Sequence, residues 1–565
     1  MHSNTSRRTF VKGLAAGGLL GGLGLWRTPV WAVTSPGEPH VLAGTDFDLL
    51  IGETPVNITG NPRTAMTING GIPGPLLRWR EGDTVTLRVK NKLNANTSIH
   101  WHGILLPANM DGVPGLSFHG IEPDGMYVYQ FKVRQNGTYW YHSHSGFQEQ
   151  SGVYGPLVID AKEPEPFQYD RDYVVMLTDW TDEDPVSLMK TLKKQSDYYN
   201  YNKPTVGDFI HDVSEKGWGS TVADRKMWAE MKMNPTDLAD VSGATYTYLM
   251  NGQAPNSNWT GVFRPGEKLR LRFINGSAMT YFDVRIPGLK MTVVAADGLH
   301  VKPVSVDEFR IAVAETFDVI VEPTEAAYTL FAQSMDRTGF ARGTLAAKAG
   351  LSAPVPPLDP RPLVTMDDMG MGGMDHGSMA GMDHSAMAMP GMQSHPETEK
   401  DNPLVDMQAM TTAPKLDDPG LGLRNNGRRV LTYSDLRSTF EDPDGRDPSR
   451  TIELHLTGHM EKFAWSFNGV KFSDAEPVRL KYGERVRVVL VNDTMMTHPI
   501  HLHGMWSDLE DENGEFMVRK HTIDMPPGSR RSYRVTADAL GRWAYHCHLL
   551  YHMEMGMFRE VRVEE

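Results

Sequence analysis

The chain has 565 residues, which at roughly 150 residues per domain is enough for three or four domains. Its 40% hydrophobic and 22% charged residues are ordinary for a globular protein, so collagen-like and fully disordered chains are excluded. The 56 Lys and Arg against 70 Asp and Glu give a net charge of −14, which argues against nucleic acid as the main partner because phosphate binding needs a cationic surface.

The first 32 residues have the pattern of an export signal. The pair Arg7-Arg8 precedes a Gly-rich apolar run over residues 13–26, and Ala32 offers a small residue for cleavage. Paired arginines are typical of the twin-arginine route. A membrane anchor is the alternative, but the run is shorter than the ~20 apolar residues that a span needs. The sequence predicts a twin-arginine signal peptide over residues 1–32 and a periplasmic protein with no transmembrane anchor after cleavage.

One strand unit recurs three times along the chain. In each copy a Gly-Asp or Gly-Glu pair opens a run of alternating apolar residues, and an Asn follows nine residues after the Gly. The copies begin at Gly82, Gly266 and Gly483 and end at Asn91, Asn275 and Asn492. Alternation of this kind is typical of half-buried strands. We therefore expect an all-β fold of three related β-sandwich domains, over residues 40–165, 166–350 and 426–565.

Two segments differ from the repeats. Residues 351–425 are rich in Pro, Gly, Asp and Met without strand or helix periodicity, which predicts a flexible linker before the third domain. Inside the second domain, residues 181–240 are more polar and partly helical in pattern. Met227 and Met231, four residues apart there, are predicted to be packing residues and not metal ligands.

Methionine is concentrated in the middle of the linker. Residues 366–392 hold nine methionines, including two copies of Met-Asp-His-x-x-Met, whose ligand-type residues are Met374, His376, Met379, Met382, His384 and Met387. Thioethers are soft ligands that prefer Cu(I). The interleaved Asp and Gly residues keep these methionines from building a core, so the segment is predicted to capture Cu(I). The alternative is a low-complexity linker with incidental methionines.

Ten of the 21 histidines lie in four short motifs. These are His100-Trp-His102, His142-Ser-His144, His498-Pro-Ile-His501-Leu-His503 and His546-Cys-His548-Leu-Leu-Tyr-His552. On a strand, residues two apart share a face, so each His-x-His presents two imidazoles to one side. Neutral imidazole suits copper, zinc, iron and nickel. Scattered core histidines are the alternative, and the paired spacing in matching repeat positions argues against it.

Cys547, the only cysteine, lies between two histidines of the fourth motif and therefore points to the opposite side of the strand. His498 is out of phase with the other histidines of its motif and can join Cys547 on that side. His552 and Met557 follow in the loop at five-residue steps. A thiolate, two imidazoles and a weak axial thioether are the ligand set of a blue-copper electron-transfer site.

The remaining eight histidines come four from the first domain and four from the third. Nine residues after the recurring Asn stand His100 in the first domain and His501 in the third, but Val284 in the second. The second domain is therefore predicted to be a spacer without copper ligands. Ser143 takes the place of Cys547 in the first domain, which contributes only imidazoles. Eight histidines at a junction between two domains suit a cluster of three coppers.

Two other kinds of site fit this pattern less well. A cysteine beside a histidine is also found in hydrolytic enzymes, but that chemistry needs one base and not eight further histidines. Structural zinc is satisfied by four ligands and leaves the rest unexplained.

The four motifs resemble those of the multicopper oxidases, the family of laccases, ascorbate oxidase and bacterial cuprous oxidases. The resemblance covers the chain after the signal, including residues 69–75, and every ligand position is filled. It implies cupredoxin-like Greek-key domains and four copper ions, one of type 1, one of type 2 and a type 3 pair. The twin-arginine signal and the Met-rich insert before the third domain resemble the periplasmic copper-resistance branch of that family most.

The resemblance also implies which residues bind each copper. His498, Cys547, His552 and Met557 would bind type 1, His100 and His501 type 2, and His102, His142, His144, His503, His546 and His548 the type 3 pair. Asp111, in residues 109–115, resembles an acid that delivers protons to oxygen in the family; a turn aspartate before glycine is the alternative. Met553 stands where some bacterial cuprous oxidases carry a glutamate, which argues against a second proton route at this position.

We therefore expect an oxidase that takes up electrons singly at Cys547, passes them through His546 and His548, and reduces O2 to water. The stretch rich in Met and His over residues 366–392, which we call the Met/His segment, favours Cu(I) as the electron donor. Cu(I) would be oxidised to the less permeable Cu(II), and phenols would be further substrates. Periplasmic copper carriers are possible partners. Two alternatives stay open: a copper-sequestering protein whose oxidase activity is secondary, and a laccase of organic phenols.

Overall fold

The three predicted strand units are strands in the structure. They are β5 (Thr84–Asn91), β13 (Leu269–Asn275) and β24 (Arg485–Asn492). Each ends on the recurring Asn, whose side-chain oxygen accepts a hydrogen bond from the main-chain N–H two residues on, while its amide donates to a main-chain carbonyl of the following loop. This local turn explains why an asparagine recurs at the same place in all three units.

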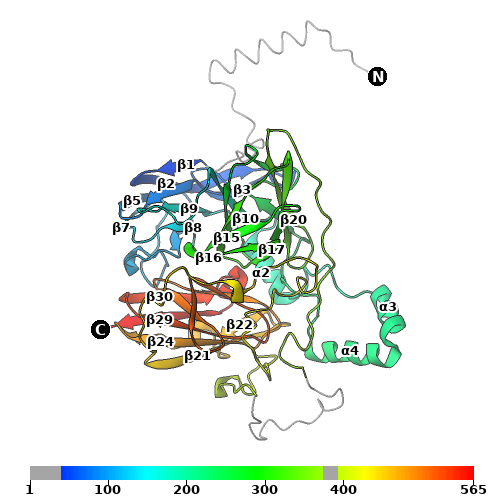
Figure 1. The fold of residues 1–565 in the computed structure, drawn as a ribbon. Helices are drawn as coiled ribbons and strands as arrows, with labels where there is room; N and C mark the ends of the chain where they lie inside the picture. The colour runs from blue at the N-terminus through cyan, green and yellow to red at the C-terminus, as the bar shows by residue number, and fades with distance from the viewer. Residues whose placement is uncertain (1–39, 373–391) are drawn as a thin grey trace, which may run out of the picture.

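The computed structural model describes residues 40–372 and 392–565. In it the strands form six sheets that pair into three β-sandwiches, coloured blue to cyan, green, and orange to red in Figure 1. The predicted all-β fold of three sandwich domains is confirmed. In β5 alternate residues are buried as predicted, with Val85, Leu87 and Val89 fully enclosed. The other two repeat strands are not half-buried: β13 is buried at every residue and β24 at all but Arg487, because both faces of these strands are covered.

The first sandwich has a five-stranded and a four-stranded sheet. The five-stranded sheet contains, in spatial order, β1 (Val41–Ala43), β4 (Leu76–Arg80), β9 (Tyr154–Asp160), β8 (Gly137–His142) and β6 (His100–His102). The four-stranded sheet contains β3 (Arg63–Ile68), β2 (Asp46–Val56), β5 and β7 (Met126–Lys132). The short 3-10 helix η1 (Ala108–Met110) ends at Asp111. Two of the histidine motifs therefore lie at one edge of this sandwich, on β6 and the adjacent end of β8.

The second sandwich pairs a six-stranded with a five-stranded sheet. The larger one contains β11 (Tyr246–Met250), β10 (Arg171–Thr181), β13, β18 (Thr316–Val321), β15 (Met291–Ala296) and β16 (Leu299–Val306). The smaller one contains β12 (Trp259–Val262), β20 (Phe340–Ala346), β19 (Ala327–Ser334), β14 (Phe282–Arg285) and β17 (Glu308–Ile311).

The third sandwich repeats that arrangement strand for strand. Its larger sheet contains β22 (Ala464–Phe467), β21 (Arg450–His459), β24, β29 (Arg530–Thr536), β26 (Ser507–Glu510) and β27 (Phe516–Lys520). Its smaller sheet contains β23 (Val478–Lys481), β31 (Phe558–Glu564), β30 (Gly541–Cys547), β25 (His498–Leu502) and β28 (Thr522–Met525). The shared strand order agrees with the sequence repeat.

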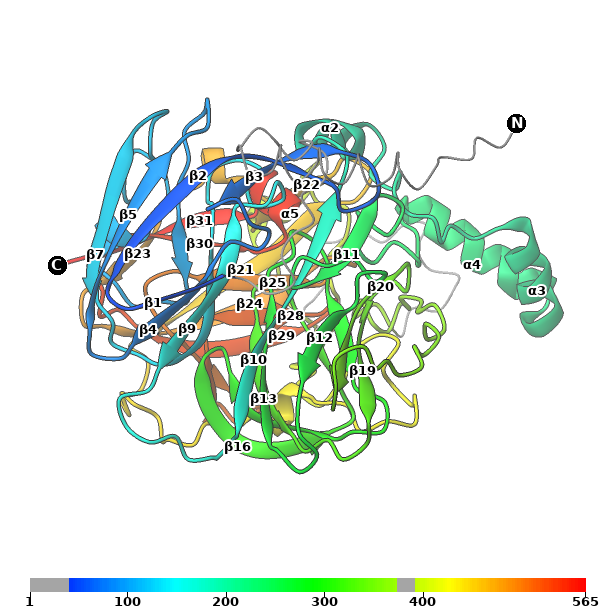
Figure 2. The same ribbon diagram turned by 90° about the horizontal axis from the view of Figure 1, so that it is seen from above.

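The segment predicted to be partly helical contains three helices. They are α2 (Pro185–Lys194), α3 (Val206–Lys216) and α4 (Trp218–Met231), and Figure 2 shows that α3 and α4 project from the body of the molecule. Met227 and Met231 pack against the hydrophobic core, as predicted. The other helices are α5 (Leu550–Glu554), η2 (Glu397–Glu399), η3 (Tyr433–Asp435) and η4 (Phe472–Asp474). No described helix is long and apolar enough to cross a membrane.

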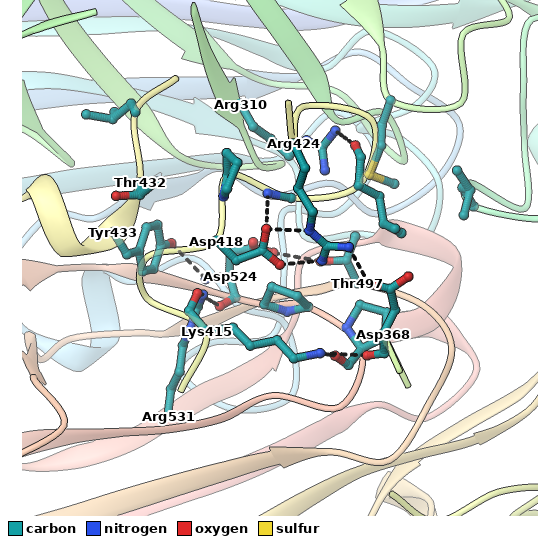
Figure 3. Close-up of a pocket in the computed structure, with 18 of the residues that line it drawn as sticks. Arg310, Asp368, Lys415, Asp418, Arg424, Thr432, Tyr433, Thr497, Asp524 and Arg531 are labelled. Carbon is teal, nitrogen blue, oxygen red and sulfur yellow. Dashed lines mark hydrogen bonds and ion pairs between the residues drawn. The ribbon is translucent and has the colours of Figure 1, made fainter. Parts of the chain in front are cut away.

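The described flanks of the predicted linker, residues 351–372 and 392–425, differ from the flexible segment that we expected. They contain no strand and no helix besides η2, yet Met369 and Met407 are buried in the core. Figure 3 shows the place where these two flanks meet the second and third sandwiches. The three parts of the chain surround a cavity of about 70 Å³. There Arg424 pairs with Asp368 at 2.6 Å, so apolar burial and ion pairs fix the flanks.

Two groups of predicted residues lie outside the described part of the chain. The signal peptide over residues 1–32 is one. The Cu(I)-capture residues Met374, His376, Met379, Met382, His384 and Met387 are the other.

Candidate metal centres

Strand pairing brings the histidine motifs together. In the first sandwich β6 pairs with β8, which places His100 directly opposite His142. In the third sandwich β25 pairs with β30, which places His501 opposite His546. The two pairs meet where the sandwiches touch, and the rings of His100 and His503 stack with their centroids 3.9 Å apart. Motifs about 400 residues apart in sequence thus form one site.

We call the eight residues at this junction the histidine cluster: His100, His102, His142, His144, His501, His503, His546 and His548. Its rings face one another across the domain boundary. His142 Nε2 lies 3.3 Å from His548 Nε2, and His144 Nε2 lies 3.3 Å from His546 Nε2. Three buried ring nitrogens, His100 Nε2, His102 Nδ1 and His501 Nε2, have no hydrogen-bond partner among the described residues. Lone pairs left unpaired in this way fit metal coordination.

Oxygen atoms hold the outer ring nitrogen of several residues of the histidine cluster. His100 Nδ1 donates to the main-chain oxygen of Asp111 at 2.8 Å, and His501 Nδ1 donates to that of His521 at 2.6 Å. Glu149 Oε2 lies 2.7 Å from His142 Nδ1. Such contacts fix the tautomer that leaves the other nitrogen free for a metal. Burial lowers the pKa of His142 and His501 well below the ordinary value and lowers that of His546 to about 3, which keeps these three rings neutral.

His498, Cys547 and His552 converge on one another, and Met557 adjoins them through its main-chain oxygen, which accepts a hydrogen bond from Cys547 N–H at 3.1 Å. We call these four residues the cysteine centre. Cys547 Sγ lies 3.5 Å from His498 Nδ1 and 3.9 Å from His552 Nδ1, and the two Nδ1 atoms are 3.2 Å apart. All four residues are buried. His552 lies in the short helix α5 and not in a loop as predicted, and Met557 follows that helix.

Outer contacts also orient the histidines of the cysteine centre. His498 Nε2 lies 2.7 Å from Thr494 Oγ1, and His552 Nε2 lies 2.6 Å from Asp240 Oδ2. Both rings therefore turn Nδ1 toward Cys547 Sγ. Burial raises the pKa of the Cys547 thiol well above its ordinary value, so a bound cation is needed to hold it as thiolate. The donor set of one sulfur and two imidazoles fits copper.

Asp111 touches the histidine cluster from two sides. Its Oδ2 lies 2.9 Å from His503 Nδ1, while its main-chain oxygen accepts from His100. The carboxylate is buried, with 1% of its surface exposed. The predicted acid thus contacts a ring from the first domain and one from the third, which a solvent-facing turn aspartate would not do.

Sequence reasoning missed three residues at these centres: Asp240, Glu149 and His521. His521 Nδ1 lies 3.2 Å from His102 Nε2. None of the three belongs to a motif with metal-ligand spacing, so no sequence signal pointed to them. Asp240 comes from the second domain, which was predicted to be a spacer and here supplies an outer contact to the cysteine centre.

Replacing Asp240 with alanine should loosen metal binding at the cysteine centre. The variant removes the acceptor that fixes the tautomer of His552, and such outer partners are typically worth 10- to 100-fold in metal affinity. We expect about a tenfold loss of Cu(II) affinity, measured as blue absorption retained against a chelator. Asp197→Ala removes an acid of the same segment that pairs with Lys203 and should retain wild-type affinity; equal loss in both variants would contradict the role of Asp240.

Comparisons with known proteins agree with this arrangement. Three multicopper oxidase family models match residues 51–164, 171–349 and 445–565. The chain is 80% identical to Copper resistance protein A homolog of Pseudomonas syringae pv. tomato over 100% of both chains, and 74% identical to Copper resistance protein A of Escherichia coli over 99% of each. The solved laccase from Botrytis aclada has a similar fold, with a TM-score of 0.61 at 21% identity over 94% of this chain and 89% of that one.

Proposed function

Because the chain belongs to the multicopper oxidase family, in its copper-resistance branch, we propose that it oxidises Cu(I), and phenols as well, while reducing O2 to water. One observation carries the proposal. Strand β30 turns Cys547 toward His498 and His552 on one side, while its two flanking histidines meet the rings of the first domain on the other. The chain thus links an electron-accepting centre to an oxygen-reducing one within three residues.

The ligand assignment follows from the two centres. We propose that His498, Cys547, His552 and Met557 would hold a type 1 copper. His100 and His501 would hold a type 2 copper. The other six residues of the histidine cluster would hold the type 3 pair. When bound, these ions supply one-electron uptake at the cysteine centre and multi-electron reduction of O2 at the cluster.

The chain's own residues supply the path, the shielding and the protons. The main chain from Cys547 to His546 and His548 provides a short covalent route between the centres. Burial of both centres excludes bulk water, which limits the loss of partly reduced oxygen. We propose that Asp111 delivers protons to the cluster, supported by its contact with His503.

The Met/His segment is proposed to capture Cu(I) for oxidation. Deleting residues 373–391 leaves the packed flanks intact, including the buried Met369. We expect slower Cu(I) oxidation at low copper and wild-type rates at saturating copper, because capture raises the local concentration of Cu(I) and takes no part in the electron path. Stopped-flow oxidation of Cu(I) under air measures this; equal rates at low copper would refute capture by the segment.

A phenol as donor separates the proposal from a laccase of organic substrates. The same deletion should leave the oxidation of dimethoxyphenol unchanged, because thioethers do not bind a phenol as they bind Cu(I). A higher kcat/KM for Cu(I) than for dimethoxyphenol supports copper as the natural donor. The reverse order would favour the laccase.

We also propose that the protein works in the periplasm, exported by the twin-arginine route and supplied with Cu(I) by periplasmic carriers. The support is the Arg7-Arg8 signal together with full-length similarity to copper-resistance proteins. Replacing both arginines with lysine should leave the protein in the cytoplasm, and export of that variant would contradict the route.

A further inference from the structure

A third group of buried imidazoles and carboxylates lies outside the two centres. His395 and Glu399 come from the linker flank after residue 391, His455 lies on β21, and Asp493 follows β24. Glu399, His455 and Asp493 are almost fully buried, and the side chain of His395 is 16% exposed. Parts of the chain about 100 residues apart thus converge on one enclosed polar group.

The ligand-type atoms of these four residues face one another. His395 Nδ1 lies 3.2 Å from Asp493 Oδ2 and 3.4 Å from Glu399 Oε2. His455 Nδ1 lies 2.6 Å from Asp493 Oδ2 and 3.8 Å from Glu399 Oε1. Ligand atoms about 2.1 Å from a tetrahedral cation lie about 3.4 Å from one another. Of the four distances, only the 2.6 Å between His455 Nδ1 and Asp493 Oδ2 would have to lengthen appreciably when a cation binds.

The outer atoms of the same residues are already occupied. His395 Nε2 donates to the main-chain oxygen of Ala409 at 3.1 Å, and His455 Nε2 lies 3.2 Å from Glu453 Oε1. Asp493 Oδ1 accepts a hydrogen bond from the main-chain N–H of Ala409 at 2.9 Å. Both imidazoles therefore turn Nδ1 inward, the arrangement found around metal-bound histidines and also at the cysteine centre.

One atom of the group is left over. Glu399 Oε2 accepts a hydrogen bond from Gln408 Nε2 at 2.9 Å, but the buried Glu399 Oε1 has no hydrogen-bond partner among the described residues. A purely structural ion-pair network would leave this carboxylate oxygen unsatisfied.

We propose that His395, His455, Asp493 and Glu399 form a fifth metal site that takes a divalent cation of borderline softness, Zn(II) or Cu(II). Two imidazoles suit both ions, and two carboxylates without sulfur disfavour Cu(I). The cation ties the linker flank to the third sandwich, one residue from Thr494, which contacts His498 of the cysteine centre. The site stands apart from the oxidase proposal, because it shares no ligand with the other centres.

Zinc retention by the copper-loaded, full-length protein tests the site. After incubation with Zn(II) and gel filtration, the wild type should retain one more zinc per chain than His455→Gln. His459→Gln removes a histidine four residues along the same strand, outside the group, and should match the wild type. X-ray absorption at the zinc edge should show nitrogen and oxygen ligands, with imidazole scattering and no sulfur. Each variant must keep its blue absorption, which reports a folded third sandwich.

Equal zinc retention by wild type and His455→Gln, or sulfur in the zinc shell, would overturn the proposal. Should His455→Gln fail to fold, Glu399→Gln, nearly identical in shape, takes its place and should bind zinc about tenfold more weakly or worse. Unchanged zinc affinity in Glu399→Gln would then overturn the site. Competition with Cu(II) identifies the preferred ion: displacement of zinc is expected, because Cu(II) binds such ligands more tightly.

Discussion

Replacing Cys547 with serine is expected to abolish both the blue absorption and the oxidation of Cu(I) and phenols, down to the uncatalysed background. Cys547 Sγ lies 3.5 Å from His498 Nδ1 and 3.9 Å from His552 Nδ1. The chain has no other cysteine that could replace it. A serine hydroxyl has nearly the same size but stays protonated and is a hard ligand. Absorption, copper content and O2 consumption measure the loss, with three coppers expected in place of four.

The same variant decides between oxidase and sequestration. It leaves His546, His548 and the Met/His segment in place, so the Cu(I)-binding capacity of the chain should persist. If cells producing Cys547→Ser survive copper as well as the wild type, sequestration protects them and oxidation is secondary. Ser143→Ala is the matched control, because it changes the residue between two histidines of the first domain without removing a ligand, and it should retain colour and turnover.

The grouping of residues in the two candidate centres was largely predictable because strand parity is a local property. Period-two alternation placed Cys547 opposite its two neighbours, and the recurring Asn aligned His100 with His501, before any tertiary contact was known. In the structure these residues lie on paired strands at the predicted sides. The spacing of a motif on a strand determines which face of the sheet each of its side chains lies on, whatever the rest of the fold.

The outer contacts were not predictable for the opposite reason. Asp240 precedes His552 by 312 residues and reaches it only through the packing of the second sandwich on the third. The linker flanks differ from the prediction for another reason. Their Pro, Gly and Asp content suggested flexibility, but burial of Met369 and the ion pair between Arg424 and Asp368 order them. The composition of a segment indicates whether it can form a hydrophobic core of its own. It carries no information about a neighbouring surface against which the segment packs.

Replacing Asp111 with asparagine is expected to slow the reoxidation of the reduced enzyme by O2 about 100-fold or more, the range in which general acids usually contribute. Asparagine keeps an oxygen that accepts from His503 Nδ1, now 2.9 Å from Asp111 Oδ2, so the ring stays oriented, but an amide carries no proton. Reduction of the cysteine centre by the donor should remain at the wild-type rate. Rapid mixing of reduced enzyme with O2, and of oxidised enzyme with donor, separates the two steps.

Two further variants distinguish proton delivery by Asp111 from a role in orienting His503 alone. Asp111→Ala removes both the proton carrier and the acceptor for His503, so a role in orientation alone predicts that alanine fails while asparagine retains the wild-type rate. Proton delivery predicts that both fail. Asp124→Asn changes another aspartate that precedes a glycine in the same sandwich, exposed and paired with Lys92, and should leave reoxidation unchanged. A wild-type rate for Asp111→Asn would therefore reduce Asp111 to an orienting residue and move the proton source elsewhere at the cluster.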